Sequence, residues 1–272
     1  MIGPAYGQPI STAFARAGNE DRAALIGYLP AGFPSRDGCV RAMAAMVEAG
    51  VDLVEIGLPY SDPLIDGPTI QQAVNQALVG GTTTAVVLDT VREVAGLGVP
   101  VLVMTYWNPV ERYGFERFAA DLAAAGGAGV ITPDLTPEEA GPWLAACSEH
   151  GLDPVLLVAP SSTETRLRRI SAACRGFVYA ASTMGVTGSR TEVSPLARGL
   201  VERTRAVTDL PVAVGLGVSN GKQAAEVAGY ADGVVVGSAF VRALLDASNE
   251  DAGIAAAAAL AGELVTGVRH RA

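Results

Sequence analysis

Three carboxylates stand close together in the sequence, with a spacing that suggests a catalytic site. Glu55 lies near the end of the apolar run 53–56, a predicted buried strand, and Asp62 and Asp66 follow in a loop among three prolines. Burying Glu55 without a partner is costly, and clustered carboxylates raise the pKa of at least one of them. The segment therefore predicts a general acid that works near neutral pH. The structural alternative pairs Glu55 with an arginine and makes Asp62 and Asp66 turn or capping residues.

Glycine-rich turns predict a phosphate site. Gly215-Leu216-Gly217 and Gly237-Ser238 each lie between a predicted strand and a predicted helix. Glycine lets backbone amides approach a ligand, and a helix N-terminus attracts anions. Gly188, in the loop 185–194, is a third candidate. Two such turns in neighbouring units favour phosphate binding over ordinary turn glycines, which are the alternative.

Aromatic and apolar residues near these turns predict a substrate pocket. Tyr179, in the run 177–181, is expected to place a hydroxyl toward the site, with a core tyrosine as the alternative. The loop 185–194 is expected to act as a lid that excludes water, with a solvated loop as the alternative. Core packing is equally an alternative for the residues that we assign to the pocket. These residues are Tyr28, Phe33, Ile65 and Leu102.

The rare residue types exclude several chemistries. His150 and His270 are the only histidines, one at a predicted helix end and one in the C-terminal tail. Neither a Ser-His-Asp triad nor a histidine-bound metal is therefore expected. Lys222 is the only lysine and stands at the start of a predicted helix, so a Schiff-base lysine is not expected. The scattered cysteines predict neither a disulfide framework nor a zinc site. They are Cys39, Cys147 and Cys174.

Charge and hydropathy predict a cytoplasmic protein. The net charge of −9 argues against nucleic-acid binding, so an anionic substrate must be held by local dipoles. Free thiols suit a reducing compartment, and the N-terminus lacks a signal-peptide pattern. The longest apolar run, 254–261, is shorter than the ~20 residues of a membrane span.

Short apolar runs rich in β-formers alternate with stretches of helical spacing, which predicts βαβ units and a parallel sheet. Eight such units in ~250 residues are the count and size of a (β/α)8 TIM barrel, an α/β fold. An open doubly wound sheet is the alternative. No linker divides the chain, so we expect a single domain over residues 1–272. The predicted strands are 25–29, 53–56, 101–104, 128–131, 155–158, 177–181, 212–215 and 233–236.

Helices are expected between these strands and at both ends of the chain. An extra N-terminal helix is predicted at 11–18, and a final helix begins after Asn249, a plausible N-cap. Apolar residues at helical spacing predict a helix in two of the stretches between strands. The residues are Val40, Met43, Ala44 and Val47 in one stretch, and Phe115, Phe118, Ala119 and Leu122 in the other.

In such a barrel the catalytic groups lie at the carboxyl ends of the strands. This rule selects the three carboxylates after the second strand, the segment 106–109 after the third and Asp134 after the fourth. The first and fifth strands end without an acid, at Pro30 and Pro160. That pattern counts against an isomerase of phosphorylated sugars, which is the alternative barrel enzyme.

The segment 55–68 resembles the signature of the tryptophan synthase alpha subunit family, and the resemblance covers nearly the whole chain. The loop 185–188 and the two glycine turns also match that family. Tyr28 and Tyr60 stand where phenylalanine is frequent, and Ile65 replaces a common alanine. The resemblance implies a lyase of tryptophan biosynthesis with this barrel fold.

The implied reaction is the retro-aldol cleavage of indole-3-glycerol phosphate to indole and glyceraldehyde 3-phosphate. The protonated indole ring is the electron sink, so the alpha subunit needs no cofactor or metal of its own. By resemblance, Glu55 shuttles protons, Asp66 accepts a hydrogen bond from the indole N–H, Tyr179 assists, and Thr187 orders the lid by reaching Asp66. The resemblance assigns the phosphate to Gly188, Gly217, Gly237 and Ser238.

The resemblance also implies a partner. The family's alpha subunit passes indole to a tryptophan synthase beta subunit that carries pyridoxal phosphate, in an alpha2beta2 tetramer. Asp62, Pro59 and Asn108 look like partner-facing loop residues. Two variants stay open: a freestanding lyase that releases indole, and a non-catalytic subunit that only activates its partner. Intact Glu55 and Asp66 argue against the second.

Overall fold

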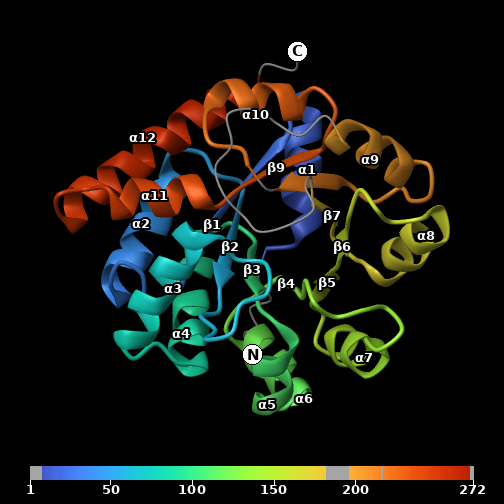
Figure 1. The fold of residues 1–272 in the computed structure, drawn as a ribbon, viewed down its shortest axis with the longest axis horizontal. Coiled ribbons are helices and arrows are strands. Elements are labelled where there is room, and N and C mark those ends of the chain that lie inside the picture. The colour runs from blue at the N-terminus through green and yellow to red at the C-terminus, as the bar shows by residue number, and fades with distance from the viewer. Residues whose placement is uncertain (1–7, 182–195, 216, 270–272) are drawn as a thin grey trace, which may run out of the picture.

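The computed structural model describes residues 8–181, 196–215 and 217–269, in which parallel strands form one sheet with helices around it (Figure 1). The strand order is β5-β4-β3-β2-β1-β9-β8-β7-β6. The strands are β1 (Ala24–Pro30), β2 (Leu53–Gly57), β3 (Val101–Met104), β4 (Gly129–Ile131), β5 (Asp153–Val155), β6 (Leu157–Val158), β7 (Val178–Ala181), β8 (Val212–Gly215) and β9 (Gly233–Val236).

The nine-stranded sheet is an eight-membered barrel in which one strand is interrupted. β5 and β6 are separated by Leu156 alone, where the prediction has one continuous strand at 155–158. β5 pairs with β4, whereas β6 pairs with β7. At the break, the Leu156 amide donates to the sulfur of Cys174 at 3.3 Å, and its carbonyl accepts from the Tyr179 amide at 3.3 Å. One chain segment thus contacts both neighbours in turn, which closes the ring and confirms the predicted (β/α)8 fold.

Successive residues of each strand point alternately into the barrel and toward the helices. Ile26, Leu53 and Leu102 belong to the cluster inside the barrel, whereas Leu25 and Val54 belong to the cluster between strands and helices. Because both faces are buried, the strands read as continuous apolar runs, which is why they were predictable. A residue two positions beyond Leu53 also faces the interior, and that residue is Glu55.

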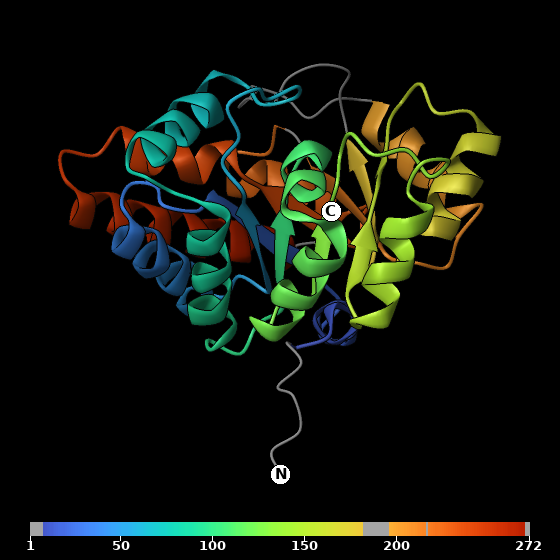
Figure 2. The same ribbon diagram turned by 90° about the horizontal axis from the view of Figure 1, so that it is seen from below.

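Helices cover the outside of the barrel, and α1 lies across its N-terminal end (Figure 2). The N-terminal helix is two residues longer than the prediction, running over Ile10–Asn19. The helices are α1 (Ile10–Asn19), α2 (Arg36–Glu48), α3 (Pro68–Val79), α4 (Thr84–Ala95), α5 (Trp107–Tyr113), α6 (Phe115–Ala124), α7 (Gly141–Glu149), α8 (Glu164–Ala173), α9 (Leu196–Arg205), α10 (Gly221–Ala228), α11 (Ser238–Leu245) and α12 (Glu250–Arg269).

Both stretches of helical spacing form helices, as α2 and α6. In α2, Met43 is buried, whereas Val40, Ala44 and Val47 are partly buried. α12 packs against α2, and a side chain at Gly38 would collide with Glu250. In α6, Phe118, Ala119 and Leu122 are buried and Phe115 is partly buried. The buried residues of α2 are Gly38, Cys39, Ala42, Met43 and Met46.

The final helix begins as predicted, with the Asn249 side chain accepting from the Ala252 amide at 2.9 Å. It is longer than its apolar run suggests, and it packs against α2, α10 and α11. Within the described ranges, α12 is the one helix whose length and hydropathy are sufficient to cross a membrane. Packed helices of globular proteins pass the same test, and Leu264 and Val268 of α12 are fully buried against the barrel.

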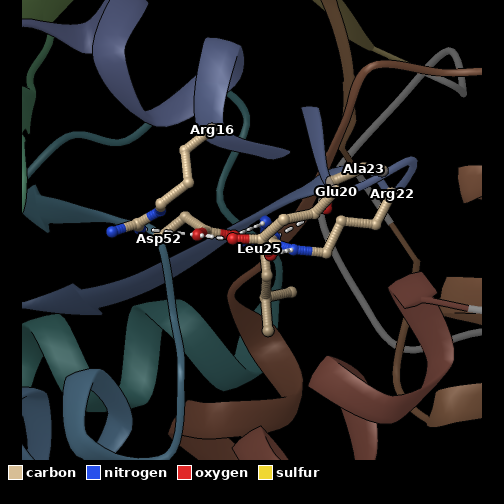
Figure 3. Close-up of polar contacts among 6 residues, drawn as sticks. All are labelled: Arg16, Glu20, Arg22, Ala23, Leu25 and Asp52. Atoms are coloured by element: carbon tan, nitrogen blue, oxygen red, sulfur yellow. Dashed lines mark hydrogen bonds and ion pairs between the residues drawn. The ribbon is translucent and has the colours of Figure 1, made fainter. Parts of the chain in front are cut away.

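A buried ion pair fixes the N-terminal end of the barrel (Figure 3). Arg22 donates to both carboxylate oxygens of Asp52, at 2.6 and 2.9 Å, and both side chains are almost fully buried. The same carboxylate accepts from Arg16 of α1 at 2.8 Å and from the Leu25 amide at 2.9 Å. Asp52 therefore joins α1, β1 and β2 at the end opposite to Glu55.

We expect Asp52→Asn to destabilise the fold. The change removes the buried carboxylate charge and leaves Arg22 only its other contacts, such as the bridge to the half-exposed Glu20 at 2.7 Å, and breaking a buried pair in this way costs up to about 3–5 kcal/mol of the free energy of unfolding. Urea denaturation measures the loss. The matched control is Asp89→Asn. The Asp89 carboxylate forms exposed ion pairs with Arg36 and Arg92, and its loss is expected to cost less than about 1 kcal/mol of the free energy of unfolding. Equal stability of the two variants would contradict the assignment.

Candidate active site

Glu55 is a buried acid without an ion-pair partner in the described part of the chain. It lies on β2 between Tyr28 of β1 and Leu102 of β3 in the strand register, and it is 1% exposed. Its Oε1 atom has no hydrogen-bond partner among the described residues, so the alternative of a structural arginine finds no support. Burial raises the pKa of Glu55 to about 8 because the charged form loses its hydration. At neutral pH the group is a neutral acid with a proton to give.

Asp66 lies in the loop between β2 and α3 and has a different environment. It is partly buried, and burial raises its pKa to about 6, while a hydrogen bond with Tyr106 opposes this rise. At neutral pH Asp66 is therefore mostly ionised while Glu55 is mostly neutral. Carboxyl groups whose environments separate their pKa values in this way divide the roles of proton donor and charge stabiliser.

Two tyrosines line the barrel interior beside Glu55. Tyr179 of β7 is buried, and burial together with the nearby Glu55 carboxyl raises its pKa. Burial raises the pKa of Tyr28 as well, with Asp66 and Glu55 as further causes. Glycines on neighbouring strands make room for both rings: a Cβ at Gly215 would lie 2.0 Å from the Tyr179 hydroxyl, and one at Gly57 would lie 2.3 Å from the Tyr28 hydroxyl.

Tyr106 is a site residue to which the sequence assigned no role. It lies just after β3, it is 6% exposed, and its hydroxyl accepts a hydrogen bond from the Ile65 amide at 3.0 Å. Its ring packs against Tyr60 with centroids 5.6 Å apart. The one feature of the sequence that indicated Tyr106 is its position just after a predicted strand. Asp134, selected by the same rule, instead accepts from the Trp107 amide at the start of α5.

The two turns predicted to bind phosphate follow β8 and β9. Ser238 is the first residue of α11 and Gly237 is its N-cap, so the first amides of this helix have no partner within the helix. Gly217, ahead of α10, has a φ of +106°, a conformation that favours glycine. A Cβ at Gly237 would lie 3.0 Å from the Tyr28 ring. Tyr28 therefore separates the predicted phosphate turn from Glu55.

The other residues predicted to belong to the site lie in different parts of the structure. Leu102 is fully buried inside the barrel, and Ile65 is partly buried in the loop that carries Asp66. Phe33 belongs to the core between strands and helices. Thr187, Gly188 and the rest of the loop 185–194 lie outside the described residues. Lys222 is exposed at the start of α10, and no metal-binding group of three or more His, Cys, Asp or Glu occurs among the described residues.

Comparison with known proteins identifies the family. The sequence profile of the tryptophan synthase alpha chain matches residues 14–269. A tryptophan synthase alpha chain from Streptomyces avermitilis is 60% identical over 99% of each chain, and one from Thermobifida fusca is 58% identical over 94% of this chain and 96% of that one. The chain belongs to the tryptophan synthase alpha chain family. It is therefore a lyase of tryptophan biosynthesis, as its resemblance implied.

Solved structures of this family share the fold. Tryptophan synthase from Mycobacterium tuberculosis is 54% identical, with a TM-score of 0.91 over 97% of this chain and 99% of that one. The alpha subunit from Legionella pneumophila is 31% identical, with a TM-score of 0.86 over 95% and 97%. The barrel of this chain is thus the family's barrel, with Glu55 and Asp66 at its carboxyl end.

Pro59 and Asn108, two of the three residues predicted to face a partner, line a pocket of about 420 Å³ beside α5. Asp62 and Asn108 are exposed, as a contact with another protein requires. Pro59 is buried within this chain, and its contact with a partner stays a prediction. It forms part of the pocket wall together with Tyr60 and Arg112.

Proposed function

We propose that this chain cleaves indole-3-glycerol phosphate to indole and glyceraldehyde 3-phosphate. The single observation that carries the proposal is that two different carboxyl groups lie at the carboxyl end of the barrel. Glu55 is buried and has an oxygen without a hydrogen-bond partner among the described residues, whereas Asp66 is mostly ionised. A retro-aldol cleavage of this substrate needs one group to move protons and another to stabilise a cationic ring. These two carboxyl groups supply both.

The proposed reaction begins with proton transfer from Glu55 to C3 of the indole ring. Positive charge then develops on the ring nitrogen, and Asp66 stabilises it by accepting the N–H hydrogen bond. The Glu55 carboxylate next removes the proton of the adjacent glycerol hydroxyl. The bond between indole C3 and the glycerol carbon breaks, and its electron pair returns to the ring. Indole and an aldehyde result, and Glu55 regains its proton.

The remaining residues hold the substrate in this proposal. Tyr179 supplies a hydroxyl beside Glu55, and Thr187 orders the lid against Asp66. The amides of Gly217, Gly237 and Ser238 bind the phosphate at the start of α11, and Gly188 adds a donor from the loop 185–194. Tyr28, Ile65 and Leu102 surround the indole ring. The acidic net charge does not oppose phosphate binding because these donors act at short range.

We also propose the partner that the family name implies. A tryptophan synthase beta subunit, carrying its own pyridoxal phosphate, docks over Asp62, Asn108 and the pocket beside α5 and receives the indole, in an alpha2beta2 tetramer. The alpha chain itself uses no cofactor. A single domain over 1–272 and a cytoplasmic location complete the proposal.

The test is indole release from indole-3-glycerol phosphate between pH 5 and 9, with and without a beta subunit. Cleavage needs Asp66 ionised and Glu55 protonated, so activity should rise through about pH 6 and fall through about pH 8. A beta subunit should raise the rate. Full activity without a partner would indicate a freestanding lyase. Substrate binding without cleavage, even in the complex, would contradict the proposal.

A further inference from the structure

Two helices begin at the two ends of the proposed substrate site. α11 begins at the turn of Gly237 and Ser238, which is the proposed phosphate site, and α3 begins directly after Asp66 and Gly67. The two helices pack against each other and against β1, because β2 and β9, which precede them, are the neighbours of β1 in the barrel (Figure 1). A bond between α11 and α3 therefore influences the distance between the phosphate turn and Asp66.

A hydrogen bond joins these two helices. The Nη2 atom of Arg242, on α11, donates to the hydroxyl oxygen of Thr69, on α3, at 2.7 Å. Arg242 is four residues after Ser238, and residues at this spacing share one face of a helix. Thr69 is buried and is three residues after Asp66. The bond thus connects the first turns of the helices that begin at the two parts of the site.

The partners of this bond are suited to fixing a distance. Arg205 pairs with Asp232 at 2.6 Å, whereas Arg242 binds a neutral hydroxyl and forms no ion pair within the described ranges. Hydrogen bonds from a charged donor are short and strong. The first turn of α3 is also tied to the catalytic loop, because the Gln71 side chain donates to the Asp66 carbonyl at 2.7 Å. A shift of Thr69 would therefore be passed to Asp66.

We infer that Arg242 is a positioning residue, whose hydrogen bond to Thr69 sets the separation between the phosphate turn and Asp66. The inference rests on the proposed function and deepens it, since that function requires one substrate to be held at both places. Arg242 acts through the two helices and not on the reacting atoms. A substrate bound at both ends reacts efficiently only when the two ends are held at matching positions, and small displacements are costly.

The first test compares ligands that occupy one end of the site with a ligand that occupies both. Indole-3-propanol phosphate has the ring and the phosphate of the substrate but no hydroxyl group on its chain, so it cannot be cleaved. Glycerol phosphate and indole each occupy one end. Thr69→Val keeps the size of the side chain and the charge of Arg242. In this variant, calorimetry should show about fivefold weaker binding of indole-3-propanol phosphate and unchanged binding of glycerol phosphate and indole.

Two control variants accompany this measurement. Thr69→Ser keeps the hydroxyl group and should bind all three ligands as the wild type does. Thr90→Val removes a buried hydroxyl that donates within α4, so it should also leave binding unchanged. Unchanged binding of indole-3-propanol phosphate in Thr69→Val would overturn the inference. Equal weakening of all three ligands would overturn it as well, because a general structural role predicts that result.

A double-mutant cycle separates the bond from the charge of the arginine. Arg242 is exposed, so Arg242→Met keeps the test available if Thr69→Val does not fold. It removes a positive charge as well as the bond, and it should weaken indole-3-propanol phosphate about fivefold more than glycerol phosphate. Adding Thr69→Val should then weaken indole-3-propanol phosphate no further, because the bond is already lost. Losses that add in the double variant would contradict the inference.

Indole release is the last measurement. Thr69→Val should lower kcat/KM for indole-3-glycerol phosphate about fivefold without moving either limb of the pH profile, because no titrating group of the site is changed. Wild-type kcat/KM in this variant would overturn the inference. If the wild-type chain releases no indole, the proposed function fails, whereas the calorimetric comparison still decides the role of Arg242.

Discussion

Glu55→Gln should reduce kcat for indole release by about 10²–10⁴-fold, because an amide cannot carry the proton that general acid–base catalysis needs. The substitution keeps the size and shape of a side chain that is 1% exposed, so KM should change little. Steady-state kinetics with a beta subunit present measures the loss. Wild-type turnover in this variant would remove Glu55 from the mechanism.

The same variant should be more stable than the wild type, which separates lost chemistry from lost folding. The pKa of Glu55 is raised in the fold from 4.5 to about 8. Above pH 4.5 the unfolded chain loses this proton while the folded chain keeps it, so the fold loses stability as pH rises toward 8. Glutamine cannot ionise. Glu55→Gln should therefore gain up to roughly 3 kcal/mol at pH 7 and nothing below pH 4. Glu93→Gln, on the exposed side of α4, should change neither stability nor activity.

Asp66→Asn should lower kcat by about 10²–10³-fold, the range for one preorganised group that stabilises transition-state charge. Asparagine still offers an oxygen to the indole N–H but carries no negative charge, so substrate binding should suffer less than turnover. The activity that remains should lose its acid limb near pH 6, since no group with that pKa is left. Steady-state kinetics across pH measures both effects.

The control for this variant is Asp89→Asn, an exposed carboxylate on α4, which should keep wild-type kinetics. If Asp66→Asn kept both its turnover and its acid limb, the charge stabilisation assigned to Asp66 would be wrong. The acid limb would then belong to another group.

The barrel was predictable because its strands are buried on both faces. The runs 101–104, 212–215 and 233–236 coincide with β3, β8 and β9. The break at Leu156 was not predictable, because it arises where one strand changes pairing partners and not from a local sequence signal. The need for glycine at position 38 was not predictable for a related reason, because it arises from the approach of Glu250 of α12, which is remote in sequence.

The sequence by itself determined which chemistry was possible. Its single lysine, its few histidines and its carboxylates at a strand end pointed to proton transfer by acids, and its motifs pointed to the family. Only the tertiary structure decided how the acids differ. A pKa depends on the hydration and partners of a group, and both are set by residues remote in sequence. The orphaned oxygen of Glu55 and the hydrogen bond from the Ile65 amide to Tyr106 therefore exist only once the barrel has closed.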